Sequence, residues 1–386
     1  MCMQINEVHE VMAKSILRNH KRIDSWFLSR YGMNLYRGCT HNCVYCDGRA
    51  EDYYVAGDFG TDVTVKTNAV EILQRELDPG RKRKPLKPGF IMLGGGVGDA
   101  YQPADRKFEL ARKVLELIHQ FNFPVHILTK SILVKRDIDL IKAINVKTRA
   151  IVSFSFSSAD DAISQIFEPG VSSPSDRLDA IRFFRNEGIA CGMFLMPVIP
   201  TISDTREKME DAIRKGIDAG VDFIIFGGMT LKEGRQKAYL MDVINEHYPD
   251  SRSFYEHIYQ GDKWGQASGE YYAAIHQTFK TIADCFNVPI RMPLKLYQDI
   301  IDENDRVVVI LDHIDYYLKM SGNRSSYAYA AYVISRIDEP ISSMKWNLRH
   351  LKGIGPTIAK VIREILDTGS SSLYNQLIRT NYADNH

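Results

Sequence analysis

The chain has 386 residues, of which 45% are hydrophobic and 25% are charged, and its formal net charge is +1. This length exceeds one average domain, so we expect one large domain and one smaller domain. A net charge this close to zero excludes a strongly basic chain, and only local basic patches can then indicate a nucleic-acid partner.

The N-terminal stretch MCMQINEVHEVMAKSILRNHKR carries charges throughout and lacks the apolar core of a signal peptide. No stretch approaches the ~18 consecutive apolar residues that a membrane-spanning helix needs. Six cysteines in a chain of this size do not suggest a disulfide scaffold, and clustered cysteines more often bind metal or do redox chemistry. We therefore expect a soluble, cytoplasmic protein with no membrane partner.

From about residue 88, short apolar runs alternate with amphipathic segments. Strands are expected at 89–96, 124–130, 149–156, 189–199 and 221–228, and helices at 105–121, 137–144, 175–188 and 204–220. The helix at 175–188 is expected to have Ser175 or Asp176 near its N-cap and Gly188 as its C-cap. Continuous apolar strands separated by helices indicate βα units and a parallel sheet. The fold class is thus α/β, a full or partial (β/α) barrel whose active site gathers at the C-terminal strand ends.

We divide the chain into four parts. An N-terminal extension (1–33) precedes the partial barrel (34–235), an aromatic-rich segment (236–300) covers the barrel, and a helical domain (301–386) follows. The last boundary is placed where the pattern becomes helical throughout. The short run at 33–36 is expected to be strand one, which puts the cysteines that follow it at the mouth of the barrel.

Three of the six cysteines lie within eight positions, in the stretch NLYRGCTHNCVYCDGRA (34–50). Their spacing is Cys39-x3-Cys43-x2-Cys46. A closed zinc site usually takes four ligands as two pairs, and a [4Fe–4S] cluster normally takes four thiolates. Three thiolates leave one iron without a protein ligand, and an open position is where chemistry happens. The alternative is a structural zinc with His41 as fourth ligand, or a degenerate cluster site.

The stretch GCTHNCVYC resembles the CxxxCxΦC signature of the radical S-adenosylmethionine (SAM) superfamily, with Tyr45 as the aromatic residue Φ. The resemblance implies that Cys39, Cys43 and Cys46 ligate three irons of a [4Fe–4S] cluster and that SAM binds the fourth. It also implies reductive cleavage of SAM to a 5′-deoxyadenosyl radical, which abstracts hydrogen from a substrate. Tyr45 would pack against the SAM adenine, and a ferredoxin or flavodoxin would donate the electron.

Within the superfamily, the chain resembles the spore photoproduct lyase-related group, also labelled DNA repair photolyase-like. The matching stretches are GDAYQPAD (98–105), ILTKS (127–131), VSFSF (152–156), FEPGVSSPSDRLDAI (167–181) and MPVIPTISD (196–204). The resemblance implies these additional cofactor-binding residues: Gly94, Gly95, Gly96, Asp99, Lys130, Ser153, Ser155, Glu168 and Arg177.

The implied roles follow the chemistry of SAM. The glycines leave backbone bare for its amino group, Lys130 neutralises its carboxylate, and Ser153 or Ser155 bonds the carboxylate or a ribose hydroxyl. Glu168 and Arg177 form a charged pair near the ribose. Each role has an alternative. Lys130 would then be a solvated surface lysine, Ser153 and Ser155 would only pack within the strand, and Glu168 and Arg177 would form an ordinary ion pair.

Two departures from the group limit the analogy. The triplet GGG replaces the GGE of many radical SAM enzymes, and no cysteine occurs between residues 47 and 190. Spore photoproduct lyases carry a hydrogen-donating cysteine near the end of this glycine strand. The spore photoproduct reaction itself is therefore not expected.

The stretch LRHLKGIGPTIAKVIREIL (348–366) has the helix-hairpin-helix pattern, in which two glycines shape a tight turn before a helix. Backbone N–H groups at such a turn attract a phosphate. Residues 307–377 resemble the small N-terminal domain of DNA polymerase beta and its relatives, but Val361 stands at the position of their Schiff-base lysine. We expect DNA binding that is independent of sequence, without lyase activity. The expected DNA-binding residues are Lys352, Gly353, Gly355, Lys360 and Arg363.

A further basic run, GRKRKPLKPG (80–89), precedes the glycine strand and matters for nucleic acid only if it flanks the barrel mouth. Taken together, the sequence favours a radical SAM enzyme that repairs or modifies a base or sugar of DNA. One alternative is a radical SAM enzyme acting on RNA or a small molecule. The other is a DNA-binding protein whose iron–sulfur cluster is not catalytic.

Overall fold

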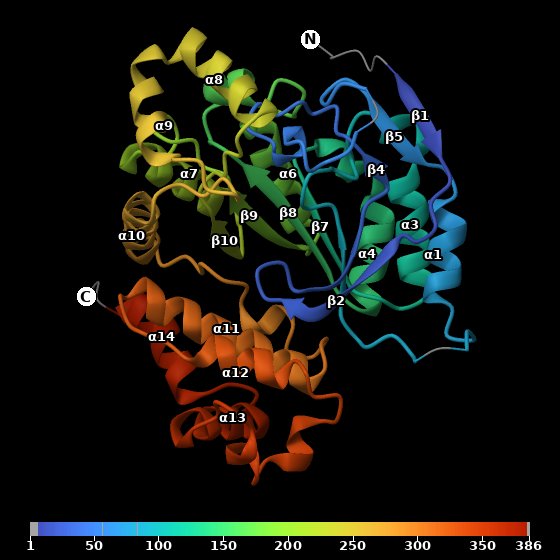
Figure 1. Ribbon diagram of the computed structural model, residues 1–386. Coiled ribbons are helices and arrows are strands. Elements are labelled where there is room, and N and C mark those ends of the chain that lie inside the picture. The colour runs from blue at the N-terminus through green and yellow to red at the C-terminus, as the bar shows by residue number, and fades with distance from the viewer. Residues whose placement is uncertain (1–6, 56, 83, 384–386) are drawn as a thin grey trace.

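A seven-stranded sheet forms the centre of the larger part of the molecule (Figure 1). The computed structural model describes residues 7–55, 57–82 and 84–383. The strand order is β10-β9-β8-β7-β6-β3-β2, and all neighbours are parallel except β2 and β3. The strands are β2 (Leu17–Asp24), β3 (Ser29–Met33), β6 (Phe90–Leu93), β7 (Val125–Thr129), β8 (Ala150–Phe156), β9 (Ala190–Leu195) and β10 (Phe223–Phe226). The predicted α/β fold with a partial barrel is confirmed.

The predicted first strand, 33–36, is wrong. Met33 ends β3, whereas β4 (Tyr36–Arg37) pairs with β5 (Val63–Lys66) in a separate sheet that also holds β1 (Val8–Val11). The main sheet also takes in β2 and β3, which the sequence had led us to place in an N-terminal extension. The sequence of β2, LRNHKRID, has no apolar pattern because this edge strand has little buried surface.

Helices cover the outer side of the sheet between successive strands (Figure 1). They are α1 (Ala69–Leu77), α2 (Asp105–Phe108), α3 (Leu110–Gln120), α4 (Ile138–Lys147), α5 (Asp161–Phe167), α6 (Pro174–Asn186) and α7 (Arg206–Ala219). The helix predicted at 105–121 is two helices, because Glu109 is left-handed (φ 53°) and the Asp105 carboxylate takes the N–H of Ala111 at 3.0 Å. The N-cap predicted for α6 is also wrong: Ser173 caps it and accepts from the N–H of Asp176 at 3.0 Å, with a proline in the first turn.

The segment after the barrel closes the β10 edge of the sheet. It contains α8 (Arg235–His247), α9 (Arg252–Ile258) and α10 (Gly269–Cys285). Phe279 of α10 stacks on Phe226 of β10, with ring centroids 4.3 Å apart. The amide of Gln236, on α8, donates to the carbonyl of Tyr45 at 2.9 Å and thus braces the cysteine loop.

The C-terminal helices pack against the β2–β3 hairpin (Figure 1). They are α11 (Glu303–Met320), α12 (Tyr327–Ile334), α13 (Pro356–Thr368) and α14 (Ser372–Ala383). Arg22 of β2 pairs with Asp312, and Arg30 Nη1 of β3 lies 3.2 Å from Asp305 Oδ1. The helical domain is therefore fixed to the edge of the sheet. No helix in the described ranges is long and apolar enough to cross a bilayer.

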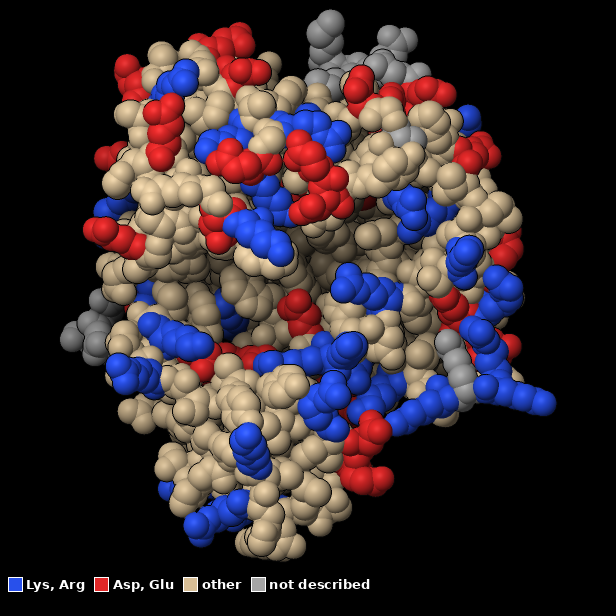
Figure 2. Space-filling model, viewed as in Figure 1, with Lys and Arg blue, Asp and Glu red and all other residues tan. Residues whose placement is uncertain are grey.

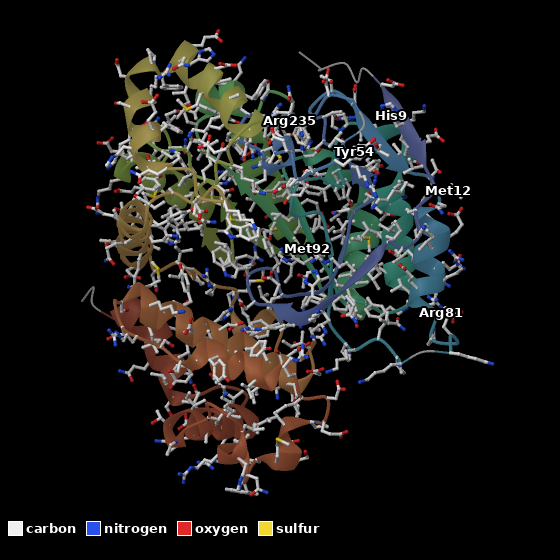
Figure 3. All side chains as sticks on the ribbon, viewed as in Figure 1. His9, Met12, Tyr54, Arg81, Met92 and Arg235 are labelled. Carbon is white, nitrogen blue, oxygen red and sulfur yellow. The ribbon has the colours of Figure 1, made fainter. Side chains whose placement is uncertain are left out.

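The basic run at 80–89 lies at the N-terminal end of β6, opposite the end where the cysteine loop is found. Lys84 Nζ lies 3.2 Å from Asp338, and Lys87 Nζ lies 3.6 Å from Asp302, both on the helical domain. Figure 3 shows Arg81 at the outer edge of the molecule, away from Tyr54 and Arg235. The run therefore does not flank the barrel mouth.

Candidate cofactor and substrate site

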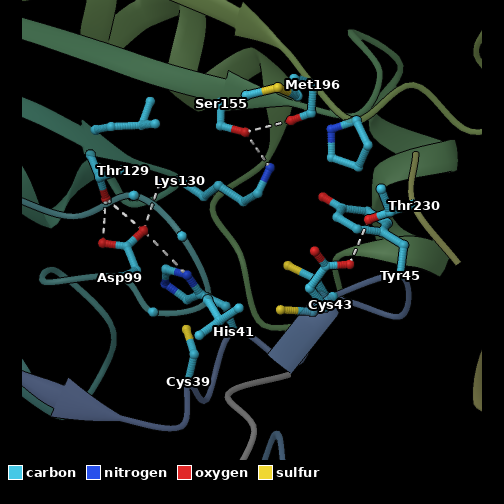
Figure 4. A pocket seen from close by; sticks show the side chains of 18 of the residues that line it. Cys39, His41, Cys43, Tyr45, Asp99, Thr129, Lys130, Ser155, Met196 and Thr230 are labelled. Carbon is cyan, nitrogen blue, oxygen red and sulfur yellow. Dashed lines mark hydrogen bonds and ion pairs between the residues drawn. The ribbon is translucent and has the colours of Figure 1, made fainter. Parts of the chain in front are cut away.

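A cavity of about 450 Å³ lies at the C-terminal ends of the parallel strands (Figure 4). Its wall combines the cysteine loop, the glycine loop after β6, and the ends of β7, β8, β9 and β10. The predicted site residues that line it are Cys39, Cys43, Tyr45, Cys46, Gly95, Gly96, Asp99, Lys130 and Ser155. Segments far apart in the sequence thus meet where the parallel-barrel argument places an active site.

The three cysteines sit on a tight loop held by its own backbone. The N–H of Asn42 donates to the carbonyl of Cys39, and that of Cys46 to the carbonyl of Cys43, both at 3.3 Å. The guanidinium of Arg49 donates to the carbonyl of Cys43 at 3.1 Å. All three thiols are free, and burial raises the pKa of Cys43 to about 12 and that of Cys46 to about 11. Burial therefore favours the neutral thiols, and metal binding has to displace their protons.

The surroundings of the cysteines bear on the choice between zinc and a cluster. Within the described ranges, no three His, Cys, Asp or Glu side chains converge closely enough to hold a single metal ion. His41 Nδ1, the fourth ligand of the zinc alternative, lies instead 3.5 Å from Asp99 Oδ2. Three separated thiols on one cavity wall suit a cluster, in which each sulfur binds a different iron.

The three glycines after β6 all have positive φ, 90°, 90° and 72° in order, which favours glycine at each. A Cβ added to Gly94 would lie 2.2 Å from the carbonyl oxygen of Leu128, so this glycine permits close contact with β7. Gly94 does not line the cavity, whereas Gly95 and Gly96 do. Nothing lies within 4 Å of a Cβ added to Gly96, so the space beside it is open to a ligand.

Asp99 is engaged by the protein itself (Figure 4). Its carboxylate accepts from Thr129 Oγ1 at 2.8 Å and from the backbone N–H groups of Tyr101 and Lys130, each at 2.8 Å. These bonds tie the glycine loop to the end of β7. The geometry favours a positioning role for Asp99, although its side chain borders the cavity.

Lys130 lines the cavity and is hydrogen-bonded to a buried network of polar side chains. Its Nζ donates to Ser155 Oγ at 2.8 Å and to Glu168 Oε1 at 2.9 Å. The Tyr45 hydroxyl also donates to Glu168, and Arg177 Nη2 lies 2.6 Å from Glu168 Oε2. Glu168 and Arg177 form a pair with both side chains at 0% exposure, behind the cavity wall.

The protonation of Glu168 follows from this network. Burial by itself would raise the pKa of the carboxyl group, but the positive charges of Arg177 and Lys130 outweigh burial. Hydrogen bonds from Tyr45 and Lys130 act in the same direction, so the pKa lies well below its usual value. Glu168 is therefore ionised at neutral pH and fixes the positions of Tyr45 and Lys130.

Of the two serines on β8, only Ser155 reaches the cavity. Ser153 is fully buried, and its Oγ lies 2.8 Å from His126 Nε2. His126 Nδ1 lies 2.7 Å from the carbonyl of Phe27, and burial lowers the pKa of His126 to about 4. Ser153 thus supports the β2–β3 turn, and the neutral His126 links the two.

Several cavity residues were missed by sequence reasoning: Phe27, Asn42, Tyr53, Phe59, Val97, Met196, Pro197, Gly228, Met229 and Thr230. The motif MPVIPTISD contains two of them, so its placement after a strand was a usable signal. Phe27 had no such signal, because it comes from the β2–β3 turn, which the sequence did not reveal. Its ring stacks on Phe194 of β9 with centroids 5.3 Å apart.

The predicted DNA-binding residues surround the start of α13. Lys352, Gly353, Gly355 and Lys360 are exposed, and Arg363 is half-buried. Gly353 has φ 79°, and Gly355 is the N-cap of the helix. The structure brings these residues together on one turn and the helix that follows it.

Comparison with known families assigns both parts of the molecule. Residues 33–215 match the radical SAM superfamily, and residues 302–371 match a helix-hairpin-helix domain. This protein contains a radical SAM domain. Its cofactors are those of the superfamily, a [4Fe–4S] cluster and SAM. The three thiols, the bare glycine backbone and the cationic Lys130 fit these two groups.

Relatives of this chain occur in bacteria and archaea. An uncharacterized protein of Mycobacterium bovis is 29% identical over 256 residues, covering 65% of this chain and 73% of its own. An uncharacterized protein of Methanocaldococcus jannaschii is 29% identical over 224 residues, covering 58% of this chain and 78% of its own.

Among solved structures, the fold is similar to that of a spore photoproduct lyase mutant with a dinucleoside spore photoproduct. The TM-score is 0.53 at 18% identity, over 72% of this chain and 79% of the other. A second mutant of that lyase, with bound AdoMet and the same dinucleoside, gives a TM-score of 0.52 at 17% identity. At these identities the likeness shows the fold.

Proposed function

We propose that this enzyme acts on DNA, where it repairs or modifies a base or a sugar. The observation that carries the proposal is the helix-hairpin-helix domain, which packs directly against the β2–β3 hairpin. That hairpin also contributes Phe27 to the cavity wall. Figure 2 shows a hollow in the middle of one face, with the helical domain directly below it. The β2–β3 hairpin therefore links the helical domain to the cavity.

The cavity residues have distinct roles in this proposal. Cys39, Cys43 and Cys46 would hold the cluster, and the backbone of Gly95 and Gly96 would receive the amino group of SAM. Lys130 and Ser155 would hold the SAM carboxylate, and Tyr45 would pack beside the adenine. When bound, the two groups would supply the radical chemistry that removes hydrogen from the substrate.

Residues behind the wall keep these groups in place. Glu168 and Arg177 hold Lys130 and Tyr45, so that the cation and the ring are preorganised before SAM binds. Apolar side chains, including Phe59 and Met229, form much of the remaining wall and limit the access of water to reactive species.

The helical domain supplies the binding energy for DNA. The exposed turn at Gly353 and Gly355 presents backbone N–H groups at the start of α13, where a phosphate is favoured. Lys352 and Lys360 add positive charge beside it. Such contacts read the backbone rather than the bases, so binding is independent of sequence. A duplex base then has to flip out to enter the cavity.

The reaction differs from that of spore photoproduct lyase. Cys191 lies fully buried on β9, and its sulfur faces the carbonyls of Ile181 and Ile189 at 3.9 and 3.7 Å. In the described part of the chain, the cavity has no cysteine besides the three of the loop. The hydrogen atom that completes the reaction therefore comes from another group. We propose a ferredoxin or flavodoxin as electron donor and the cytoplasm as location.

The proposal is tested by 5′-deoxyadenosine formation in anaerobically reconstituted protein with SAM and dithionite. Reactions contain no nucleic acid, intact, gapped or UV-irradiated DNA, or RNA. We expect stimulation by DNA, its loss in Cys43→Ala, and a weaker response in Lys352→Ala/Lys360→Ala. Equal product with every nucleic acid would overturn the DNA assignment, and stimulation by RNA alone would indicate the RNA-modifying alternative. A loaded cluster without product would indicate the non-catalytic alternative.

A further inference from the structure

A second cavity, of about 350 Å³, adjoins the first and shares Phe27, Gly95 and Gly96 with it. It lies along the inner side of β2 and β3, next to Met92 of β6, which Figure 3 places at the middle of this face. Apart from the shared Gly95 and Gly96, none of the residues that line it has a role in the proposed binding of the cluster or SAM. Its position beside the glycine loop means that a ligand in it would meet a ligand in the first cavity.

Two cations and one carboxylate line the second cavity. Arg18 and His20 face it from alternate positions of β2, and Lys66 faces it from the end of β5. Burial lowers the pKa of His20, so the positive charges are those of Arg18 and Lys66. Asp24 also lines it, but its carboxylate accepts the N–H groups of Trp26 at 2.8 Å and Phe27 at 3.3 Å. The Asp24 carboxylate is therefore already hydrogen-bonded within the turn between β2 and β3.

The two permanent cations have no acidic partner among the described residues. Arg18 makes no ion pair there, and Lys66 Nζ donates to the backbone carbonyl of Asn34 at 2.5 Å. Burial and the charge of Arg37 lower the pKa of Lys66. An anion bound beside Lys66 would offset the burial of its ammonium group and the repulsion from Arg37, and Lys66 and Arg18 could both donate charge-assisted hydrogen bonds to it.

We propose that the second cavity binds the nucleotide on which the radical acts, with Arg18 and Lys66 contacting phosphates of its DNA strand. This inference rests on the proposed function and names its substrate-binding residues. A volume of about 350 Å³ is within the range of small-molecule sites. Ile16, Met33 and Met92 give the cavity its apolar surface. The shared glycines would put the nucleotide against SAM.

The test compares Arg18→Gln and Lys66→Gln with Lys21→Gln, which removes the same charge from β2 at a position outside both cavities. The readouts are the KM for DNA in DNA-stimulated 5′-deoxyadenosine formation and its dependence on salt. Each cavity variant is expected to raise KM about 10-fold and to reduce the slope of log KM against log salt by ~0.7 for a single strand. Lys21→Gln is expected to match wild type, and melting curves check the fold.

The arms of the experiment separate the possible failures. If DNA does not stimulate wild type, the proposed function fails. If DNA stimulates wild type but the cavity variants behave like Lys21→Gln, only the second-cavity assignment fails. If deoxynucleoside monophosphates have the same KM as the oligonucleotide, the proposal that the cavity binds a nucleotide within a strand is wrong. If RNA of the same sequence has a lower KM than DNA, the proposal that the strand is DNA is wrong.

Discussion

Replacing Glu168 by Gln tests the network that holds Lys130 and Tyr45. The change keeps the shape of the side chain but leaves the guanidinium of Arg177, at 0% exposure, without its counter-charge. Removing one partner of a buried ion pair costs about 3–5 kcal/mol, whereas exposed pairs contribute about 0–1 kcal/mol. Since a folded domain is stable by about 5–15 kcal/mol, Glu168→Gln should remove about a fifth or more of the stability.

The matched control is Asp179→Asn. Asp179 and Arg182 form a pair of the same N···O length, 2.6 Å, but with 71% and 47% of their side chains exposed. Loss of this exposed ion pair should change the free energy of unfolding by less than about 1 kcal/mol. Urea unfolding, followed by tryptophan fluorescence, measures both variants.

A double-mutant cycle with Arg177→Met completes the test. The double variant should lose less stability than the sum of the single variants, by about 1 kcal/mol or more, because the uncompensated charge is gone. Since the folded-state pKa of Glu168 is depressed, its contribution is present above pH 4.5 and is lost as the pH falls below that value. A cost for Glu168→Gln equal to that of Asp179→Asn, or strict additivity, would refute the reasoning.

Three further predictions concern the cavity and the domain contact. Gly94→Ala should lower the free energy of unfolding by more than Gly96→Ala, because a Cβ at Gly94 would lie 2.2 Å from the carbonyl oxygen of Leu128, whereas a Cβ at Gly96 would meet no atom within 4 Å. Equal urea midpoints of the two variants would contradict this. Ser155→Ala should raise the KM for SAM, whereas Ser153→Ala should leave that KM unchanged and cost about 1–3 kcal/mol in urea unfolding by leaving a buried histidine nitrogen unpaired. His313 has a folded-state pKa of about 3, mainly because of burial, so its contribution to stability is present above pH 6.5 and is lost as the pH falls. The destabilisation caused by His313→Gln should therefore shrink by about 2 kcal/mol between pH 7 and pH 5, and a constant difference would show that this histidine is not buried in its neutral form.

The sequence predicted the parts of the fold whose residues have a strong pattern. The strands β6 to β10 are predominantly apolar because both faces are covered, and this made the parallel sheet recognisable. The strand β2 was not recognisable, because one face lies toward a cavity and its residues are polar. For the same reason the hairpin that carries Phe27, and with it part of the cavity wall, was missed.

The candidate site was predicted at the level of motifs rather than of side-chain directions. Spacing alone grouped the three cysteines, and strand ends located Lys130 and Ser155. Alternation along β8 put Ser153 and Ser155 on one face, but depth along the strand separates them, and depth cannot be read from alternation. Glu168 and Arg177 were expected as a pair near the ribose, whereas burial places them behind the wall.

The central claim is that the radical formed in this enzyme takes hydrogen from DNA. The most direct measurement uses DNA in which the carbon-bound hydrogen atoms are replaced by deuterium. Mass spectrometry of the 5′-deoxyadenosine produced then shows whether it has gained deuterium. Transfer of deuterium into the product, absent with deuterated RNA and in Cys43→Ala, is the predicted result. Product that carries no deuterium, formed at the same rate with and without DNA, would contradict the account.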